Sequence, residues 1–348
     1  MKQYISVFVV LLLVTAGCAK KAETAKTATK VETPKTAKAP AETKKVEAKP
    51  KVAAEPKKEA AKKAPVAKAE TKPAAKGVIK VTDVGFATPE SVLHDTKMDL
   101  YYVSNINGSP LAADGNGFIS RIAPNGKMVA LKWLDGTKKE ITLNAPKGMV
   151  LVGRTLFVTD LDHVRKFDAE SSTSTGNIKI AGSSFLNDVV LGSDGAVYVS
   201  DSGLKGGEKG FVPSGTDAIY RIAPKADKAE VVVKNTELGR PNGLLHHNNT
   251  LWVVTFGTGE LYSLDKSGKR ANVKKSEKGA LDGLLLAADG QVIFSSWEGS
   301  AVYKGPLAGP YTAIIKDVKA PADIGYDAKR KRILIPLFMS NAVEIHSI

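Results

Sequence analysis

The sequence predicts an all-β protein, a six-bladed β-propeller preceded by a disordered Lys/Ala/Pro-rich linker. Three observations lead to this expectation. One sequence pattern recurs in six copies, spaced roughly 40 to 57 residues apart. Each copy holds several short strands separated by turn residues. This is typical of propeller blades, because one four-stranded sheet cannot bury both of its faces alone. The residues before the first copy have a composition that cannot form a core.

The clearest copy is residues 237–265, ELGRPNGLLHHNNTLWVVTFGTGELYSLD. Arg240-Pro241-Asn242-Gly243 and Asn248-Asn249 are turn signals, and the apolar segments between them predict three short strands. The other five copies occupy residues 88–108, 144–168, 184–203, 280–305 and 321–348. Together the six copies predict a single domain over residues 78–348.

Residues 1–18, MKQYISVFVVLLLVTAGC, have the features of a lipoprotein signal peptide. Lys2 supplies the positively charged N-terminal region of a signal peptide. The apolar segment that follows is too short to span a bilayer. Thr15-Ala16-Gly17 before Cys18 resembles a bacterial lipobox, which implies cleavage before Cys18 and acylation there as a membrane anchor. The residue after Cys18 is Ala19 and not Asp. In a Gram-negative host this resembles lipoproteins that are sorted to the outer membrane, which implies a propeller facing the periplasm. The alternative is an ordinary signal peptide with an incidental cysteine.

Residues 19–77 predict a disordered tether. They contain 17 Lys and 7 Glu, a net charge of +10 out of the chain's +14, and no aromatic residue, Leu, Ile or Met. Such a segment cannot bury a core, and its prolines stop any long helix. We expect a spacer between membrane and propeller, or alternatively a cationic arm that contacts anionic lipid or cell wall. Nucleic acid is not an expected partner, because the basic tail has no interleaved aromatic residues.

The propeller is expected to close through its first strand. Residues 77–86, GVIKVTDVGF, predict a lone strand before the first copy, whereas the last copy ends after three strands. The lone strand would complete the last blade and remove two open sheet edges. Gly-rich insertions follow the second strand of the first and third copies, at residues 107–118 and 202–217. The sequence leaves open whether these insertions cover the candidate site or lie on the opposite face.

One polar residue lies just before the innermost strand of each copy. These residues are Glu90, Lys147, Asn187, Asn242, Asp282 and Asp323. The innermost strands of a propeller line its channel, so the column predicts a ring with one residue per blade at one channel mouth. Carboxylate and carboxamide oxygens suit a hard divalent cation. The alternative is that the Asn-Gly and Asp-Gly pairs are only turn residues.

Four ring residues resemble the metal-binding pattern of the SMP-30/gluconolactonase family, a resemblance that covers residues 78–348. They are Glu90 in TPESVL, Asn187 in LNDVVL, Asn242 in RPNGLL and Asp282 in LDGLLL. The resemblance implies one divalent metal held by Glu90, Asn242 and Asp282, with Asn187 near substrate or water. Ca²⁺ is preferred, and Mg²⁺, Mn²⁺ or Zn²⁺ are alternatives.

The same resemblance implies a mechanism, the hydrolysis of a lactone or related ester. The metal would polarise the carbonyl and stabilise the developing oxyanion. A carboxylate would activate water as a general base. Asp282 is the expected ligand and base together, with Asp188 or Asp323 as alternates.

Two departures from the family pattern bear on the substrate. Lys147 places an ammonium in the ring, where it would repel a cation, pair with Glu90 or Asp323, or hold a carboxylate or phosphate of a substrate. The family often has a basic residue near Asn187, and this chain has Phe185-Leu186 there. Two functions therefore stay open. One is a metal-dependent hydrolase with Asn187, Lys147 and Asp323 near the substrate. The other is a non-catalytic envelope propeller that binds a small ligand, glycan or protein partner.

Other catalytic chemistry lacks support in the sequence. There is no G-x-S-x-G, no H-E-x-x-H, no P-loop and no G-x-G-x-x-G after a strand, which excludes the common serine hydrolase, zincin and nucleotide-binding motifs. His246 and His247 are adjacent and point to opposite faces of a strand. Cys18 is the only cysteine, so the mature domain can form no internal disulfide. Trp133, Trp252 and Trp297 are expected to pack between blades.

Overall fold

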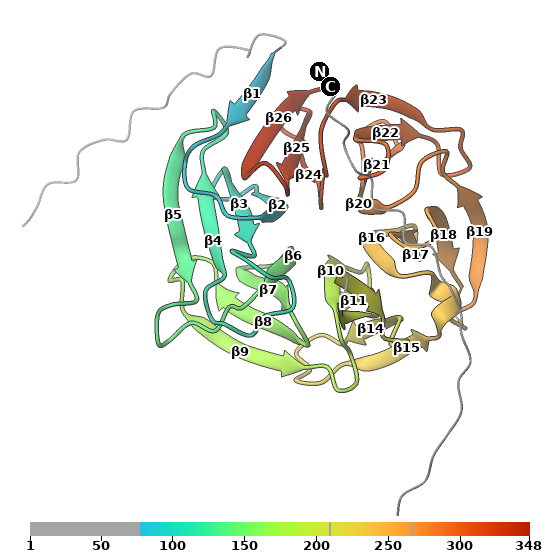
Figure 1. Ribbon diagram of the computed structural model, residues 1–348, viewed down its shortest axis with the longest axis horizontal. Helices are drawn as coiled ribbons and strands as arrows, with labels where there is room; N and C mark the ends of the chain where they lie inside the picture. Colours follow the sequence, from blue (N-terminus) through green and yellow to red (C-terminus); the bar gives the residue numbers. More distant parts are fainter. Residues whose placement is uncertain (1–76, 209, 266) are drawn as a thin grey trace, which may run out of the picture. The chain divides into compact units, whose positions relative to one another are not determined.

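The computed structural model describes residues 77–348 except 209 and 266, and Figure 1 shows six blades around a central axis. The predicted signal peptide with Cys18, and the predicted tether up to residue 76, lie outside the described residues. In the described part of the chain, no helix is long and apolar enough to cross a membrane. The prediction of an all-β, six-bladed propeller is confirmed.

Blades 1 to 3 are four-stranded antiparallel sheets whose strands follow each other from the axis outward in chain order. Blade 1 consists of β2 (Pro89–Asp95), β3 (Leu100–Asn105), β4 (Phe118–Ile122) and β5 (Met128–Asp135). Blade 2 consists of β6 (Pro146–Val152), β7 (Thr155–Asp160), β8 (His163–Asp168) and β9 (Ser174–Lys179). Blade 3 consists of β10 (Leu186–Leu191), β11 (Val197–Asp201), β14 (Ala218–Ile222) and β15 (Glu230–Lys234).

Blades 4 and 5 repeat this arrangement, and blade 6 departs from it in its outermost strand. Blade 4 consists of β16 (Pro241–His247), β17 (Thr250–Thr255), β18 (Glu260–Leu264) and β19 (Arg270–Lys275). Blade 5 consists of β20 (Leu281–Leu286), β21 (Val292–Ser296), β22 (Ala301–Gly305) and β23 (Thr312–Lys316). Blade 6 consists of β24 (Gly325–Asp327), β25 (Arg332–Leu337), β26 (Ala342–Ser347) and β1 (Val78–Val81).

Two short elements lie outside the blades. The hairpin of β12 (Leu204–Gly207) and β13 (Gly210–Pro213) forms its own two-stranded sheet within the third-blade insertion. The 3-10 helix η1 (Thr236–Leu238) precedes blade 4 and ends at Gly239, whose left-handed φ of 74° stops it.

The circle of blades closes at two levels. Neighbouring innermost strands contact each other in the order β2, β6, β10, β16, β20, β24 and back to β2. At the rim, β1 pairs with β26, so that Val81 lies opposite Val343. The predicted lone strand therefore completes the last blade, and strands from the two ends of the propeller share one sheet.

The apolar core lies between neighbouring blades, since each sheet covers a face of the next. Each cluster of buried side chains combines residues of adjacent sheets, such as blades 1 and 2 or blades 2 and 3. At the junction of blades 6 and 1, Val81, Phe86 and Val92 pack with Leu334 and Val343. Closure of the circle thus depends on the same apolar contacts as the other junctions.

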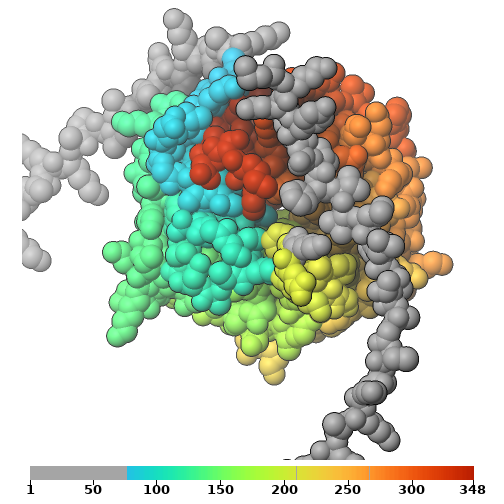
Figure 2. All heavy atoms as spheres, in the orientation of Figure 1, coloured from blue at the N-terminus to red at the C-terminus, as the bar shows by residue number. Residues whose placement is uncertain are grey.

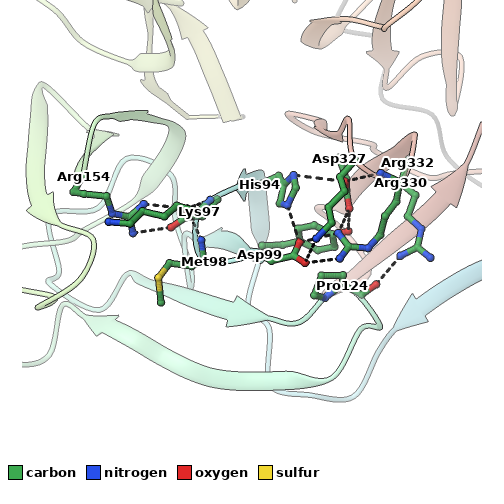
Figure 3. Close-up of polar contacts among 12 residues, drawn as sticks. His94, Lys97, Met98, Asp99, Pro124, Arg154, Asp327, Arg330 and Arg332 are labelled. Carbon is green, nitrogen blue, oxygen red and sulfur yellow. Dashed lines mark hydrogen bonds and ion pairs between the residues drawn. The ribbon is translucent and has the colours of Figure 1, made fainter. Parts of the chain in front are cut away.

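A polar network fastens the first blade to the last (Figure 3). It includes His94, near the end of β2, and so lies at the opposite end of that strand from Glu90. Arg330 in the β24–β25 turn donates to Asp99 of blade 1 at 2.8 and 2.5 Å, and to Asp327 at 2.8 Å. The His94 ring lies between the two carboxylates, 3.3 Å from Asp99 and 3.6 Å from Asp327. The Tyr101 hydroxyl donates to Asp327 at 2.5 Å.

An ion pair links blades 1 and 2 at the same end. Arg154 donates to both oxygens of Asp95, at 3.0 and 2.8 Å, and the Tyr102 hydroxyl donates at 2.7 Å. Burial opposes ionisation of Asp95, but the hydrogen bonds from Arg154 and Tyr102 outweigh it and lower its pKa to about 2. The Asp95 carboxylate therefore stabilises the fold only when it is ionised.

Removing β1 should destabilise the whole propeller. A chain that begins at Gly77 keeps the outermost strand of blade 6, and we expect its melting temperature to match that of the full chain. A chain that begins at Ala87 loses β1 together with buried Val81 and Phe86, and exposes an edge of β26. We expect a large drop in melting temperature, measured by circular dichroism. Equal melting temperatures for the two shortened chains would contradict closure through β1.

The Asp95–Arg154 pair predicts an acid-dependent loss of stability. The carboxyl has a pKa of about 2 in the folded protein and about 3.9 when unfolded. A lowered pKa stabilises the fold above the unfolded value, and this contribution is lost as the pH falls from about 4 to about 2. At neutral pH we expect Asp95→Asn to cost about 1 to 2 kcal/mol, allowing for screening by solvent. Urea denaturation should show this difference shrinking across that pH range. A difference independent of pH would contradict the assignment.

Candidate functional site

The predicted ring residues occupy equivalent positions at one end of the axis. In blades 1 to 5 each is the second residue of the innermost strand, namely Glu90 in β2, Lys147 in β6, Asn187 in β10, Asn242 in β16 and Asp282 in β20. Asp323 lies two residues before β24 and bridges to Ser91 of blade 1. The sequence pattern predicted these residues just before the strands. The structure corrects this for five blades, since those strands begin one residue earlier, at Pro or Leu.

A β-bulge interrupts the innermost strand at the ring residue in each of these five blades. The pairing of the first and second strands shifts register at the same place in every case, between Pro89 and Val92, Pro146 and Met149, Leu186 and Val189, Pro241 and Leu244, and Leu281 and Leu284. Bulges release residues from the ladder and re-aim their side chains. A repeated bulge thus accounts for a repeated polar position beside the axis.

Glycine follows the ring residue where the next innermost strand comes close. A Cβ added to Gly148 would lie 2.7 Å from the Cα of Asp188. A Cβ on Gly243 or Gly283 would collide with the backbone of the next blade. The Asn-Gly and Asp-Gly pairs are therefore positions of close backbone contact, where no larger residue fits.

Hydroxyl groups on the second strands connect neighbouring ring positions. Ser200 accepts a hydrogen bond from the N–H of Asp188 at 2.9 Å and donates to the carbonyl of Asn242 at 2.7 Å. This joins blade 3 to blade 4. Thr159 of blade 2 donates to the carbonyl of Asn187 in blade 3, and Ser295 of blade 5 accepts the N–H of Gly283 and donates to the carbonyl of Ala322 before blade 6. Ser104 occupies the same position in blade 1, where it accepts the N–H of Ser91. Sequence reasoning missed this column, although the segments YVSN, FVTD and YVSD carry its signal.

A left-handed residue recurs just before the ring. Among the seventeen described non-glycine residues with left-handed φ angles, four lie two or three residues before a ring residue, namely Thr88 (51°), Arg240 (58°), Ala280 (50°) and Ala320 (45°). Each carbonyl accepts the N–H of the residue that follows the second strand of its own blade. A left-handed non-glycine residue costs about 1–2 kcal/mol, and such strain is typical of functional sites. Four blades therefore share the same backbone turn into the innermost strand.

Four ring side chains each have a buried oxygen without a hydrogen-bond partner in the described structure. These oxygens are Glu90 Oε2, Asn187 Oδ1, Asn242 Oδ1 and Asp282 Oδ1. The four residues are at most 6% exposed. Unpaired buried acceptors are costly and rare in folded proteins. Four of them in one ring match the oxygen ligands that a hard divalent cation requires, so the residues present fit a metal.

Neighbouring groups hold the remaining polar atoms of two of these side chains. Trp297 Nε1 donates to Asp282 Oδ2 at 2.7 Å, and Asn187 Nδ2 donates to Ser202 Oγ at 3.1 Å. Ser202 in turn donates to the carbonyl of Pro241 at 2.7 Å. Asp282 Oδ1 and Asn187 Oδ1 are left without a hydrogen-bond partner in the described structure. Trp297 was expected to pack between blades, and the structure shows that its indole N–H also donates to a ring carboxylate.

The ring makes its own carboxylates costly to ionise. Burial raises the pKa of Glu90 well above its usual range, and the charges of Asp282 and Asp323 raise it further. Burial also raises the pKa of Asp282, again together with Asp323, while the Trp297 hydrogen bond opposes the shift. A cation among these oxygens would reverse the penalty, because it favours the charged forms.

The two alternate carboxylates are engaged by protein donors. Asp188 accepts the N–H of Val189 at 2.6 Å through one oxygen and that of Leu244 at 2.7 Å through the other. Asp323 Oδ2 accepts the Ser91 hydroxyl at 2.5 Å. Burial raises the pKa of Asp323 to about 7, and the Ser91 bond opposes that shift. Asp188 therefore links blades 3 and 4, and Asp323 links blades 6 and 1.

Lys147 is 1% exposed and directs its ammonium to backbone carbonyls. It donates to Ala145 at 3.1 Å and to Pro110 at 3.4 Å, and it lies 4.4 Å from the ring centre of Phe185. An ion pair with Glu90 or Asp323 was one of the alternatives that the sequence left open, and neither carboxylate is among the hydrogen-bond partners of Lys147 in the described structure. Burial lowers the pKa of Lys147, although the nearby charge of Glu90 opposes this.

Both insertions lie at the ring end of the propeller, which answers the question that the sequence left open. Pro110, in the first-blade insertion, accepts the ammonium hydrogen bond just described. Phe211, in the β12–β13 hairpin, packs edge-on against Phe185, with ring centres 5.9 Å apart. The two insertions also meet, because a Cβ on Gly206 would lie 3.5 Å from Leu111. Figure 2 shows the blue-green and yellow segments side by side near the centre of the visible face.

The free oxygens of this ring come from both carboxylates and carboxamides. Within the described residues, no group of three or more His, Cys, Asp or Glu side chains is arranged to hold a metal ion. Two of the four free oxygens in the ring belong to asparagine carboxamides instead. Such a mixed oxygen set favours Ca²⁺ or Mg²⁺ over metals that prefer sulfur or imidazole.

Comparison with known proteins supports the fold. No protein-family model matches the chain, and no curated protein matches it in sequence. A gluconolactonase from Xanthomonas campestris is similar with a TM-score of 0.59 at 18% identity, over 77% of this chain and 88% of that one. Virginiamycin B lyase from Staphylococcus aureus has a TM-score of 0.55 at 14% identity, over 78% and 99%.

A further similar structure is a catalytically inactive variant of that Staphylococcus aureus lyase, with a histidine replaced by alanine and with quinupristin bound. It has a TM-score of 0.51 at 14% identity, over 78% of this chain and 99% of that one. The propeller arrangement shared with gluconolactonases, which the sequence predicted, is confirmed. Identities this low establish the shared fold, and the activity must be argued from the ring itself.

The hydroxyl groups that join neighbouring ring positions should contribute to the stability of the fold. Ser200→Ala leaves the N–H of Asp188 and the carbonyl of Asn242 unpaired in a buried place, so we expect a cost of about 1–3 kcal/mol. Urea denaturation measures it. Ser193→Ala is the control, since that hydroxyl is exposed and should change stability by less than about 0.5 kcal/mol. Equal effects of the two substitutions would show that the column does not support the ring.

Proposed function

We propose that this protein is a divalent-metal-dependent hydrolase of a lactone or related ester. The observation that carries the proposal is the set of four free buried oxygens on Glu90, Asn187, Asn242 and Asp282. Ca²⁺ is the preferred cation, with Mg²⁺, Mn²⁺ or Zn²⁺ as alternatives, because every candidate ligand is a hard oxygen donor. The shared fold with a gluconolactonase agrees with this reaction class.

The ring residues divide the work of hydrolysis among them. A bound divalent cation would polarise the carbonyl of the substrate. Glu90, Asn242 and Asp282 would hold the cation, while Asn187, fixed by Ser202, would orient substrate or water. Asp282 would also accept the proton of the attacking water as general base while the water oxygen bonds to the carbonyl carbon. As the carbon–oxygen bond of the ester breaks, Asp282 would pass that proton to the leaving alkoxide. Trp297 keeps Asp282 in position during these steps.

Asp188 and Asp323, the alternate general bases, differ in how many of their carboxylate oxygens accept hydrogen bonds. Both oxygens of Asp188 accept backbone N–H groups, so we assign Asp188 to positioning the innermost strands of blades 3 and 4. Asp323 has one oxygen engaged by Ser91. It is therefore the better alternate to Asp282 as general base.

The ring residues in the described structure offer carboxylates and no imidazole as a base. The lyase with the same fold becomes inactive when a histidine is replaced by alanine. None of the six ring residues described here is histidine. His246 lies near the end of β16 that is away from the ring, where it contacts Tyr198 with ring centres 5.5 Å apart. A carboxylate base acting on water therefore fits the residues of this ring.

A non-catalytic, ligand-binding propeller is the second candidate. Lys147 favours it, because a buried ammonium beside the ring offsets the negative charge that attracts a cation. In this alternative the ring would bind a small ligand, a glycan or a protein partner without turning it over.

We also propose a location in the bacterial cell envelope. The support is the sequence of residues 1–18, with a lipid anchor at Cys18 in the outer membrane and the propeller facing the periplasm. The basic tether would reach anionic lipid or cell wall. Detergent partitioning of the Cys18→Ala chain tests this, because loss of the anchor should release the protein into the aqueous phase.

A thermal-shift titration tests the metal. Since a ligand that binds only the native state raises its melting temperature, we expect Ca²⁺ to stabilise the full chain by several degrees. Asp282→Asn should abolish this shift, and Trp297→Phe should weaken it by freeing the carboxylate. Asp289→Asn is the matched control, because its carboxylate pairs with Lys304 on the surface and should leave the shift unchanged. No shift with Ca²⁺, Mg²⁺, Mn²⁺ or Zn²⁺ would exclude the metal-dependent hydrolase.

A further inference from the structure

Aromatic residues occupy the same position in three consecutive blades. Phe256, Trp297 and Phe338 each directly follow the second strand, in blades 4, 5 and 6. The backbone N–H of each one donates to the carbonyl of the left-handed residue before the ring in the same blade, which is Arg240, Ala280 or Ala320. Because the second strand ends opposite the start of the innermost strand, all three residues lie at the ring end of the propeller.

These three side chains form one continuous surface. The rings of Phe256 and Trp297 meet edge to face, with centres 5.4 Å apart at 82°, and those of Trp297 and Phe338 are 5.0 Å apart at 52°. We call Phe256, Trp297, Phe338 and the adjacent Met339 the aromatic wall. The wall starts at the ring itself, since the Trp297 indole N–H donates to Asp282.

The aromatic wall is open to solvent. Its three aromatic side chains are only partly buried, and Met339 is 69% exposed. Large apolar groups stabilise a fold most when fully buried, so a contiguous, partly open group of them indicates a binding surface. Contacts among the rings hold this surface in place before any ligand arrives.

A second apolar surface lies on the opposite side of the ring, on the two insertions. Phe211 is 52% exposed and packs on Phe185, and neighbouring Val212 is 37% exposed. Leu111 of the first-blade insertion lies next to the same hairpin. The ammonium of Lys147 is buried beneath these groups and bonded to carbonyls, so it offers little to a substrate. Apolar side chains thus border the ring on two sides.

We propose that the substrate of this ring is an ester or lactone with an apolar body, an aryl group or acyl chain, and not a polyhydroxylated sugar lactone. This inference rests on the proposed hydrolase function. The carbonyl would lie at the ring oxygens, and the apolar body would lie along the aromatic wall and the face of Phe211. A polyhydroxylated body would leave its hydroxyl groups facing apolar side chains that cannot hydrogen-bond to them.

The catalytic test uses the full Ca²⁺-loaded chain and a series of p-nitrophenyl esters from acetate to octanoate, together with δ-decalactone and gluconolactone. We expect kcat/KM to rise about threefold per added methylene as the acyl chain extends along the wall. Phe338→Ala should lower kcat/KM at least tenfold for octanoate and less than about twofold for acetate. Phe338→Leu should recover most of the loss. Val231→Ala, on the exposed outer strand β15, is the control for an exposed apolar residue away from the ring.

A binding test separates this inference from the hydrolase proposal. The neutral fluorescent probe N-phenyl-1-naphthylamine should bind the full chain and accept energy from Trp297, with the signal lost in Trp297→Phe and weakened in Phe338→Ala. δ-Decalactone should displace the probe, and gluconolactone should not. Melting temperatures of the variants show whether each one is folded.

Each outcome decides one proposal or both. Wall-dependent probe binding without hydrolysis of any compound would support the apolar site and overturn the hydrolase. Hydrolysis of gluconolactone in preference to δ-decalactone, unaffected by Phe338→Ala, would keep the hydrolase and overturn the apolar substrate. Esterase activity that is independent of acyl length, together with no probe binding, would also overturn it.

Discussion

The close approach of six innermost strands around the axis is the constraint on which the rest of the structure depends. Backbone lies against backbone at Gly148, Gly243 and Gly283, where a Cβ would collide with the next blade. The β-bulges at the ring residues of blades 1 to 5 free N–H and carbonyl groups, and hydroxyls such as that of Ser200 then join these groups between blades. Outer strands and interblade cores can vary in length and composition, but this inner circle leaves little freedom.

That same inner circle concentrates charge where water is scarce. Several carboxylates share the buried ring, and burial raises the pKa of Glu90, Asp188 and Asp282 alike. Burying charged groups without partners costs several kcal/mol each in proteins. Asp188 recovers part of that cost because both of its oxygens accept backbone N–H groups, whereas Glu90 and Asp282 each keep a buried oxygen without a hydrogen-bond partner in the described structure. The unequal treatment of otherwise similar carboxylates is the strongest physical sign that the free oxygens serve a ligand.

The propeller is symmetric in its strands and asymmetric around its ring. The position after the second strand holds Ile106, Leu161 and Ser202 in blades 1 to 3, and aromatic residues in blades 4 to 6. Blades 1 and 3 instead extend insertions over the same end. Symmetric packing of the blades provides the scaffold, and substitutions at equivalent turn positions provide a site with distinct sides.

The sequence by itself determined the six repeats, the closing strand and the column of ring residues, because hydrophobic periodicity and turn residues are local signals. Only the tertiary structure decided which ring oxygens stay free, that Trp297 orients Asp282, and that Lys147 turns to Ala145 and Pro110. It also placed both insertions at the ring. These features join residues that lie in different strands and turns or in different blades. They depend on bulges and strand directions that no local pattern specifies, since they arise only when the blades pack around one axis.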